Sequence, residues 1–421
     1  MQLLFNSSQV SRDVNRQINF FMLSALFARC IFIYTILVIF FQQYGLSFAQ
    51  ILLIFALEGV VTFVFEIPTG ILADVWGKKK TVLAGMLLGI AGLASYIIHP
   101  SFAFFMVAEV LLAIGNACES GAHTAIIYSK FEKYNIQDEY RSYVKKKSRL
   151  MPIAASITVL CASALFYLNS YLPFYLSIFF MLLSFALMCL VEDDQKVKAK
   201  KRTDSVNVAK WNVPAFVRSS FLPLAKNKQL LTLSLCSAFL ITMYANTAYL
   251  SQVYLLDLGL PLPVMGIFFF VLSLMSSLSA SYSEKLFKTF NMDRFLILFL
   301  LMCVSTAMLN FQLLLLVIPL YLIFAFINGV ISQTIDSEIP ALMDEGSRAT
   351  ALSIVSFIQG FFALIFEPLL GLLIDHTGIS TMYLILGLTT SFVVLLALVY
   401  RFVKRGVTNS QWMRQKRPEV N

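Results

Sequence analysis

Apolar residues in this chain are gathered into runs of roughly 20 residues, the length at which a helix crosses about 30 Å of hydrocarbon. Every backbone N–H and C=O inside lipid must find a partner within the protein, so such runs are expected to be helices. Polar turns separate the runs. The pattern predicts twelve membrane-spanning helices, at residues 18–41, 48–72, 81–98, 101–127, 150–168, 172–191, 229–252, 263–281, 295–311, 313–338, 349–373 and 379–402.

The longest polar stretch, at residues 192–228, divides the chain into two sets of six predicted spans. Its lysine-rich first part is expected to be a solvated linker. Its second part mixes aromatic residues with Arg218, which is typical of a segment that lies on an anionic membrane surface. The predicted fold is an all-α integral membrane protein with two pseudo-symmetric six-helix halves. The predicted parts are residues 1–191, the cytoplasmic linker 192–228, residues 229–403 and a basic cytoplasmic tail at 404–421.

The composition and the placement of charge agree with a membrane protein. Hydrophobic residues make up 59% of the chain, charged residues only 13%, and the mean hydropathy is +0.79. If the N-terminus is cytoplasmic, the cytoplasmic segments carry 31 of the 32 Lys and Arg residues, and Arg29 lies inside the first predicted span. We therefore expect a multi-pass protein of the cell membrane with both termini in the cytoplasm. The net charge of +9 then reflects topology and lipid contact, and it does not indicate nucleic-acid binding.

A motif begins near the end of the second predicted span. The sequence Glu-Ile-Pro-Thr-Gly at residues 66–70 is followed by Asp74, Gly77 and three lysines. It resembles the loop signature between spans 2 and 3 of the major facilitator superfamily, and its first five residues resemble one bacterial subgroup of that family. The resemblance implies the twelve-helix major facilitator fold, alternating access, and a loop that latches the two halves together in one state. The positions that carry this gating motif are Glu66, Gly70, Asp74, Gly77, Lys78 and Lys79.

The spacing of this motif occurs a second time, at the end of the eleventh predicted span. The first copy is followed by three lysines and the second by none, which predicts that they lie on opposite sides of the membrane. Transporters built from inverted repeats show such a relation. For the glutamate of each copy we expect an interface or helix-end hydrogen bond. The two copies are Glu66, Gly70, Asp74, Gly77 and Glu367, Gly371, Asp375, Gly378.

Ionisable residues inside the predicted spans are the best candidates for function, because a charge in lipid is costly and usually faces a partner or water. On span 4, four polar side chains share one helical face with Glu119 beside them. Arg29 could pair with Glu58 or Glu119 and only fix packing. However, the carboxyl groups outnumber this single arginine, so at least one is expected to carry a proton. The candidates for a substrate or proton pathway are Arg29, Glu58, Glu109, Asn116, Glu119, His123, Asn246 and Asp336.

The sequence offers no enzyme site. There are three His residues without a Ser/His/Asp grouping, and neither an HExxH motif nor a nucleotide-binding loop occurs. No metal site or cofactor is expected. We predict a monomeric secondary transporter, a proton-coupled exporter of small amphiphilic or cationic compounds such as drugs or metabolites. Two alternatives stay open: uptake or facilitated diffusion of a small anionic nutrient bound by Arg29, and the flipping of a lipid or amphiphile.

Overall fold

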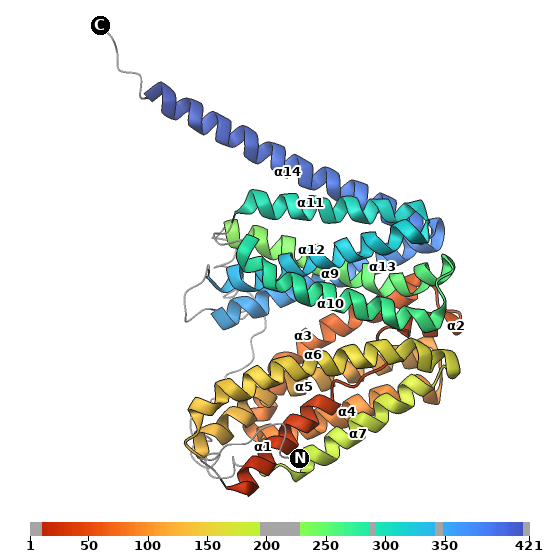
Figure 1. The fold of residues 1–421 in the computed structure, drawn as a ribbon, viewed down its shortest axis with the longest axis vertical. Helices are drawn as coiled ribbons and strands as arrows, with labels where there is room; N and C mark the ends of the chain where they lie inside the picture. Colours follow the sequence, from red (N-terminus) through yellow and green to blue (C-terminus); the bar gives the residue numbers. More distant parts are fainter. Residues whose placement is uncertain (1–10, 194–227, 287–290, 342–347, 416–421) are drawn as a thin grey trace.

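The computed structural model describes residues 11–193, 228–286, 291–341 and 348–415. In these ranges the regular elements are helices, gathered into one bundle (Figure 1). The N-terminal helices, α1–α7, lie in the lower part of Figure 1, and the C-terminal helices, α9–α14, lie in the upper part. The elements are α1 (Arg12–Phe27), α2 (Leu37–Gln43), α3 (Phe48–Trp76), α4 (Lys78–Ile98), α5 (Phe102–Lys133), α6 (Gln137–Leu168), α7 (Leu172–Leu190), α9 (Lys228–Asp257), α10 (Leu262–Leu286), α11 (Met292–Met308), a short 3-10 helix (Leu309–Phe311), α12 (Leu314–Ala341), α13 (Arg348–Thr377) and α14 (Ile379–Gln415).

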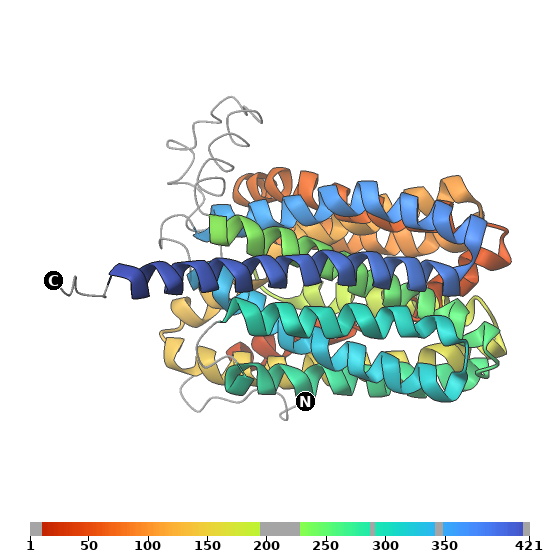
Figure 2. The same cartoon turned by 90° about the horizontal axis from the view of Figure 1, so that it is seen from above.

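Eleven of the predicted spans each coincide with one helix. In the described part of the chain, 11 helices are long and apolar enough to cross a membrane. Several extend beyond their apolar run: α6 begins at Gln137, and α14 continues to Gln415, past the rest of the bundle (Figures 1 and 2). The predicted surface segment at 211–224 lies outside the described residues.

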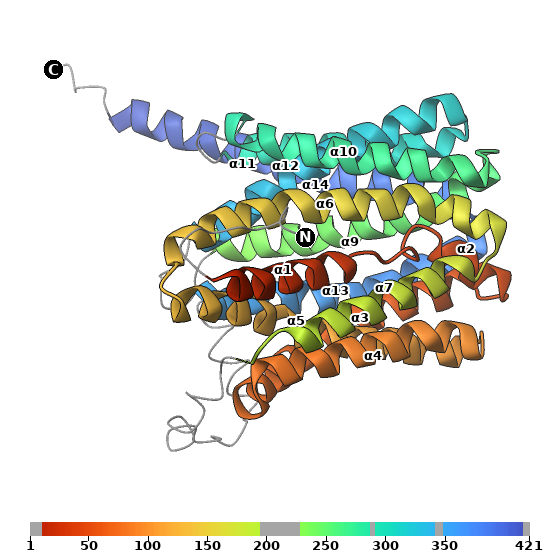
Figure 3. The same ribbon diagram turned by 60° about the horizontal axis from the view of Figure 1, so that its bottom comes forward.

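The prediction of one continuous helix over residues 18–41 is wrong. Helix α1 ends at Phe27, α2 begins at Leu37, and residues 28–36 between them are not helical. Side chains from other helices satisfy the backbone of this break. The N–H of Phe32 donates to Ser177 Oγ of α7 at 2.8 Å, and α1 lies beside α7 (Figure 3). The break thus meets the rule that irregular backbone at membrane depth must be buried in protein or line a wet cavity.

Gln252 of α9 supports the other side of the same break. Its Oε1 accepts a hydrogen bond from the N–H of Val38 at 3.1 Å, and its Nε2 donates to the C=O of Tyr34 at 2.7 Å. The amide therefore replaces, in both directions, the hydrogen bonds that a continuous helix makes within itself. It also joins the first N-terminal helices to the first C-terminal helix.

Helices α3 and α13 make the close contact between the N-terminal and C-terminal helices. They run antiparallel: Gly371 near the end of α13 meets Ala49 at the start of α3, and Gly360 meets Gly59 further along. A Cβ on Gly371 would lie 2.4 Å from the Cα of Ala49, so the two backbones approach as closely as glycine allows. We call the end of the bundle at which α3 begins the Asp375 end, and the opposite end the Asp74 end.

Each copy of the repeated motif ends in a glycine that separates two helices. Gly77, with a φ of 98°, lies between α3 and α4, and Gly378, with a φ of 84°, lies between α13 and α14. Residues with a side chain rarely adopt a positive φ, so glycine is the residue that permits such tight connections between helices. The repeated spacing therefore corresponds to the same local structure in both places.

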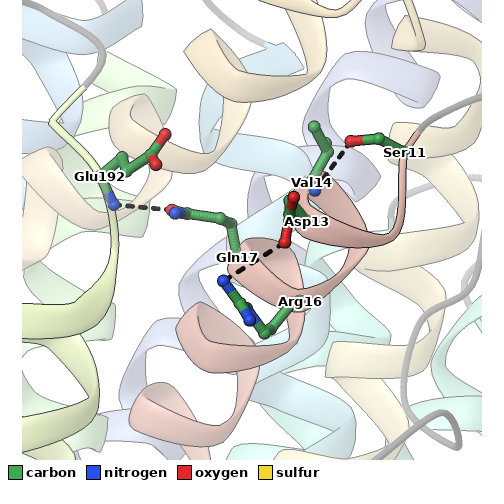
Figure 4. A network of polar contacts seen from close by, with 6 residues as sticks. All are labelled: Ser11, Asp13, Val14, Arg16, Gln17 and Glu192. Carbon is green, nitrogen blue, oxygen red and sulfur yellow. Dashed lines mark hydrogen bonds and ion pairs between the residues drawn. The ribbon is translucent and has the colours of Figure 1, made fainter.

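Gln17 of α1 holds the chain where the N-terminal helices end. Its side-chain Oε1 accepts hydrogen bonds from the backbone N–H of Glu192 at 2.6 Å and from Lys130 Nζ of α5 at 3.3 Å. Figure 4 shows the contact with Glu192, next to the ion pair of Arg16 with Asp13 on the same helix. One buried amide thus ties α1, α5 and the residues that follow α7.

Candidate functional site

Five ionisable side chains from the break, α3 and α5 form two interacting groups, and charges of both groups act on Tyr34. The charge of Arg29 acts on Glu119 and His123 of α5. Glu58 of α3 acts on Glu109 of α5. The structure thus brings together Arg29 and the polar face of span 4. We call Arg29, Glu58, Glu109, Glu119 and His123 the central polar cluster.

Arg29 lies in the non-helical break, and its side chain is exposed. Within the described residues it forms no ion pair, so simple pairing with Glu58 or Glu119 is not what the structure shows. Its neighbour Tyr34 is 42% exposed, although the charges of Arg29, Glu58 and Glu109 all act on it. Accessible polar groups among interacting helices indicate a wet interior at the break.

The polar face of α5 is also partly accessible. Asn116 is exposed, and Glu119 and His123 are half-buried. The ring of His123 lies against that of Phe21 in α1, with a centroid separation of 4.7 Å, and the charge of Lys147 in α6 also acts on it. The His123 end of the predicted face on α5 therefore lies against the ring of Phe21 in α1 and near the charge of Lys147 in α6.

Glu109 differs from the rest of the cluster because it is buried, with 3% of its surface exposed. The hydroxyl of Tyr96 in α4 donates a hydrogen bond to its Oε1 at 2.5 Å. The sequence did not single out Tyr96, because one tyrosine among 17 in an apolar chain carries no distinguishing pattern. The hydroxyl can donate to Oε1 whether or not Oε2 carries a proton. The hydrogen bond also fixes the orientation of the Glu109 side chain.

A second polar contact joins α9 and α13. Asn246 is 1% exposed, and its Nδ2 donates to the C=O of Thr242 at 2.8 Å and to Glu367 Oε1 at 3.1 Å. Glu367 is itself 5% exposed, so it makes the interface hydrogen bond that its sequence suggested, but away from solvent. Glu66, which holds the matching position in the first motif copy, is exposed.

The two aspartates of the repeated motif differ in their exposure and hydrogen bonds. Both carboxylate oxygens of Asp375 accept hydrogen bonds from the start of α3, from Phe48 N–H at 2.8 Å and Ala49 N–H at 3.0 Å. Asp74 is exposed, and the described residues give it no hydrogen bond. Lys78 is half-buried, and Lys79 donates to the C=O of Cys189 at 2.9 Å, at the end of α7.

Among the other candidates, Asp336 belongs to α12, but its side chain lies outside the described residues. Two polar groups of the same helix do meet: Ser332 Oγ donates to Asn328 Oδ1 at 3.4 Å. In the described ranges no group of three His, Cys, Asp or Glu side chains is placed to hold a metal ion. A groove of about 570 Å³ between α3, α4 and α5 shares no residue with the central polar cluster, and its lining carries no charged side chain.

Comparison with known families decides what kind of protein this is. The family model of the Major Facilitator Superfamily matches residues 18–366, which is most of the chain. The chain belongs to the major facilitator superfamily. It is therefore a membrane transporter and not an enzyme, as its sequence indicated.

Other transporters resemble the chain in sequence or in fold. YxaM, an uncharacterised MFS-type transporter of Bacillus subtilis (strain 168), is 23% identical over 246 residues, which are 58% of this chain and 60% of that relative. The crystal structure of the nucleoside transporter NupG has a TM-score of 0.75 at 13% identity, covering 92% of this chain and 99% of NupG. An auto-inhibited peptide transporter of the POT family has a TM-score of 0.66 at 15% identity, covering 91% and 96%. At these identities the solved structures show a shared fold.

Within this superfamily member, the groups that sequence reasoning missed are those that serve the break. Ser177 and Gln252 are polar residues inside apolar spans, which was the available signal. A continuous first helix has no free backbone groups for them to bind, so hydropathy alone gives no reason to expect their contacts. Their role follows only once the break at residues 28–36 is seen.

Proposed function

We propose that this transporter exports small amphiphilic or cationic compounds in exchange for protons, by alternating access. The observation that carries the proposal is the charge balance of the central polar cluster. The cluster holds three carboxyl groups and one arginine: Glu58 acts on Glu109, and Arg29 acts on Glu119. One guanidinium cannot neutralise three carboxylates, so the cluster favours the uptake of protons or of a cationic substrate. Exchange of one for the other at shared carboxyl groups is the simplest form of proton-driven export.

For the topology we propose twelve crossings, with α1 and α2 together forming the first. Neither helix alone is long enough to cross, and the break between them is held by α7 and α9. With both termini in the cytoplasm, as the Lys and Arg distribution favours, the Asp375 end faces outward. The two six-helix halves would then be related by the repeated motif.

The unequal states of the two motif copies support alternating access. At the Asp375 end α3 and α13 are in contact, and the aspartate there is engaged. At the Asp74 end the corresponding Asp74 is exposed, and a Cβ on Gly70 would meet nothing within 4 Å. We propose that this arrangement is the outward-closed state. In the opposite state, Asp74 would accept hydrogen bonds from the start of α13, as Asp375 does here from the start of α3.

Transport in reconstituted vesicles tests the proposal. Purified protein is placed in liposomes with an imposed pH gradient, and the movement of ethidium, a lipophilic cation, is followed by fluorescence. Glu58→Gln, Glu109→Gln and Glu119→Gln remove each charge while keeping the shape of the side chain. We expect at least one variant to lose gradient-driven transport while it still folds. Undiminished transport in all three variants would contradict the proton-coupled mechanism.

A second candidate, uptake of a small anion, has one observation in its favour. Arg29 is exposed and forms no ion pair within the described residues, so its guanidinium is available to a carboxylate or phosphate. Arg29→Lys and Arg29→Ala would then abolish the binding of an anion selectively. Thermal-shift screening of anionic against cationic compounds, on the wild type and on both variants, separates this candidate from cation export.

A further inference from the structure

Glu367 lies in the part of α13 that packs against α3. Gly360, Glu367 and Gly371 are seven and four residues apart, a spacing that places all three on one face of the helix. The two glycines on that face contact α3 directly, at Gly59 and at Ala49. The carboxyl group is therefore held between two points of close backbone contact, which agrees with its burial.

The polar contacts of this carboxyl are incomplete. Asn246 of α9 donates to Oε1, but Glu367 Oε2 is buried without a hydrogen-bond partner in the described part of the molecule. Asn246 Oδ1 is likewise buried without a donor. A proton on Glu367 would convert Oε2 into a donor. Asn246 Oδ1, the acceptor that lacks a donor, belongs to the side chain whose Nδ2 already binds Glu367 Oε1.

The described surroundings of Glu367 supply no positive charge. Among the described residues, the titratable groups that act on it are Glu58 of α3 and Tyr249 of α9. Helices α12 and α14 also contact α13, but their described residues bring no group that acts on Glu367. A carboxylate buried beside another acidic group, with one donor and no cation, would be strongly destabilising, whereas a neutral acid is compatible with these contacts.

We propose that Glu367 and Asn246 form a proton-binding site where α3, α9 and α13 meet, and that occupancy of this site keeps α3 and α13 together. The proton binds Glu367 Oε2 while the Asp375 end is closed. When α13 separates from α3, water reaches the carboxyl and the proton leaves. The carboxylate left behind faces Glu58 and opposes reclosure until a proton returns. The role of this site in transport rests on the proposed proton coupling, whereas the binding of the proton does not.

Difference infrared spectroscopy of the purified protein tests the site directly. The pH is raised stepwise, and the carbonyl stretch of protonated carboxyl groups is followed in water and in deuterium oxide. We expect the wild type to lose a protonated-carboxyl band that is absent from Glu367→Gln at every pH. In Asn246→Ala the band should persist but change frequency, because the hydrogen bond from Asn246 Nδ2 to the carboxyl is gone.

The first motif copy provides the matched control. Glu66→Gln changes the same motif position, but at an exposed carboxyl, so its spectrum should keep the buried band of the wild type. Equal spectra for the wild type and Glu367→Gln in the carboxyl region would overturn the proposal. So would a band whose loss follows sodium concentration instead of pH. If Glu367→Gln does not fold, the frequency shift in Asn246→Ala still decides whether this carboxyl is protonated.

The link to conformation has a separate readout. Spin labels at Gln43 and Leu313, two exposed positions at the Asp375 end, report the separation of the N-terminal and C-terminal helices. In the wild type we expect higher pH to shift the distance distribution toward longer values, and in Glu367→Gln we expect this shift to be at least halved. An identical pH response in both proteins would refute the coupling. If the wild type shows no gradient-driven transport of ethidium, that result would count against the proposed function alone.

Discussion

Asp375 at the end of α13 accepts a hydrogen bond of 2.8 Å from the backbone N–H of Phe48 at the start of α3. Its second oxygen accepts the N–H of Ala49. These N–H groups have no partner within their own helix, and a carboxylate beside them also interacts favourably with the helix dipole. A side chain of the C-terminal helices thus completes the first turn of a helix 327 residues earlier in the chain.

Removing this carboxylate should open the Asp375 end. In Asp375→Ala, α3 loses an acceptor for two N–H groups, at a cost of about 1 kcal/mol, which changes the ratio of closed to open molecules about fivefold. Double electron–electron resonance between labels at Gln43 and Leu313 should show a larger long-distance population. Asp257→Ala, which removes an exposed carboxylate at the end of α9, is the control and should leave the distribution as it was. Equal distributions for the two variants would show that the contact does not stabilise closure.

Gly371→Ala should disrupt the same contact by steric means. The added Cβ would lie 2.4 Å from Ala49 Cα and 2.6 Å from Ala49 N, which backbone atoms cannot tolerate without moving. We expect the distance distribution at the Asp375 end to broaden and the melting temperature in detergent to fall. Gly70→Ala, at the matching position of the other copy, meets nothing within 4 Å. It should not destabilise this state. An equal fall in melting temperature for both variants would contradict the close approach of α3 and α13.

Gln252→Leu should be among the most destabilising polar substitutions in the chain. It leaves the N–H of Val38 and the C=O of Tyr34 without their partner, and each buried unsatisfied backbone group costs about 1–3 kcal/mol. Thermal unfolding in detergent measures the effect. Gln359→Leu is the matched control, since among the described residues Gln359 Nε2 donates to Ser237 Oγ and binds no backbone group. A loss in Gln252→Leu no larger than that in the control would mean that the break does not depend on Gln252.

Tyr96→Phe should impair transport through Glu109. The substitution removes the hydroxyl that donates to Glu109 Oε1, and a hydrogen bond to a carboxyl that can be charged contributes about 1.5–3 kcal/mol. We expect lower gradient-driven transport in Tyr96→Phe and little further loss when it is combined with Glu109→Gln. A double-mutant cycle on both transport and melting temperature gives the coupling. Additive losses would show that the two side chains act independently.

The sequence alone identified most of the helices and the residues of the central polar cluster. Hydrocarbon thickness sets the length of an apolar run, so eleven spans could be located without knowing what they pack against. Helical periodicity placed Glu109 and His123 on the polar face of α5, and the rarity of charge in lipid singled out Arg29 and Glu58. The repeated Glu, Gly, Asp and Gly spacing likewise marked two connections that end in left-handed glycines.

The tertiary structure decided the contacts between segments that are distant in the chain. The break after α1 is held by Ser177 and Gln252, which lie 145 and 214 residues from the backbone groups they bind, so local hydropathy could not reveal it. The partner of Glu109 and the burial of Glu367 depend in the same way on which helices meet. An apolar run determines that a segment enters the membrane, because that depends on its own transfer from water. Which polar group satisfies which depends on packing, and only the assembled bundle specifies that.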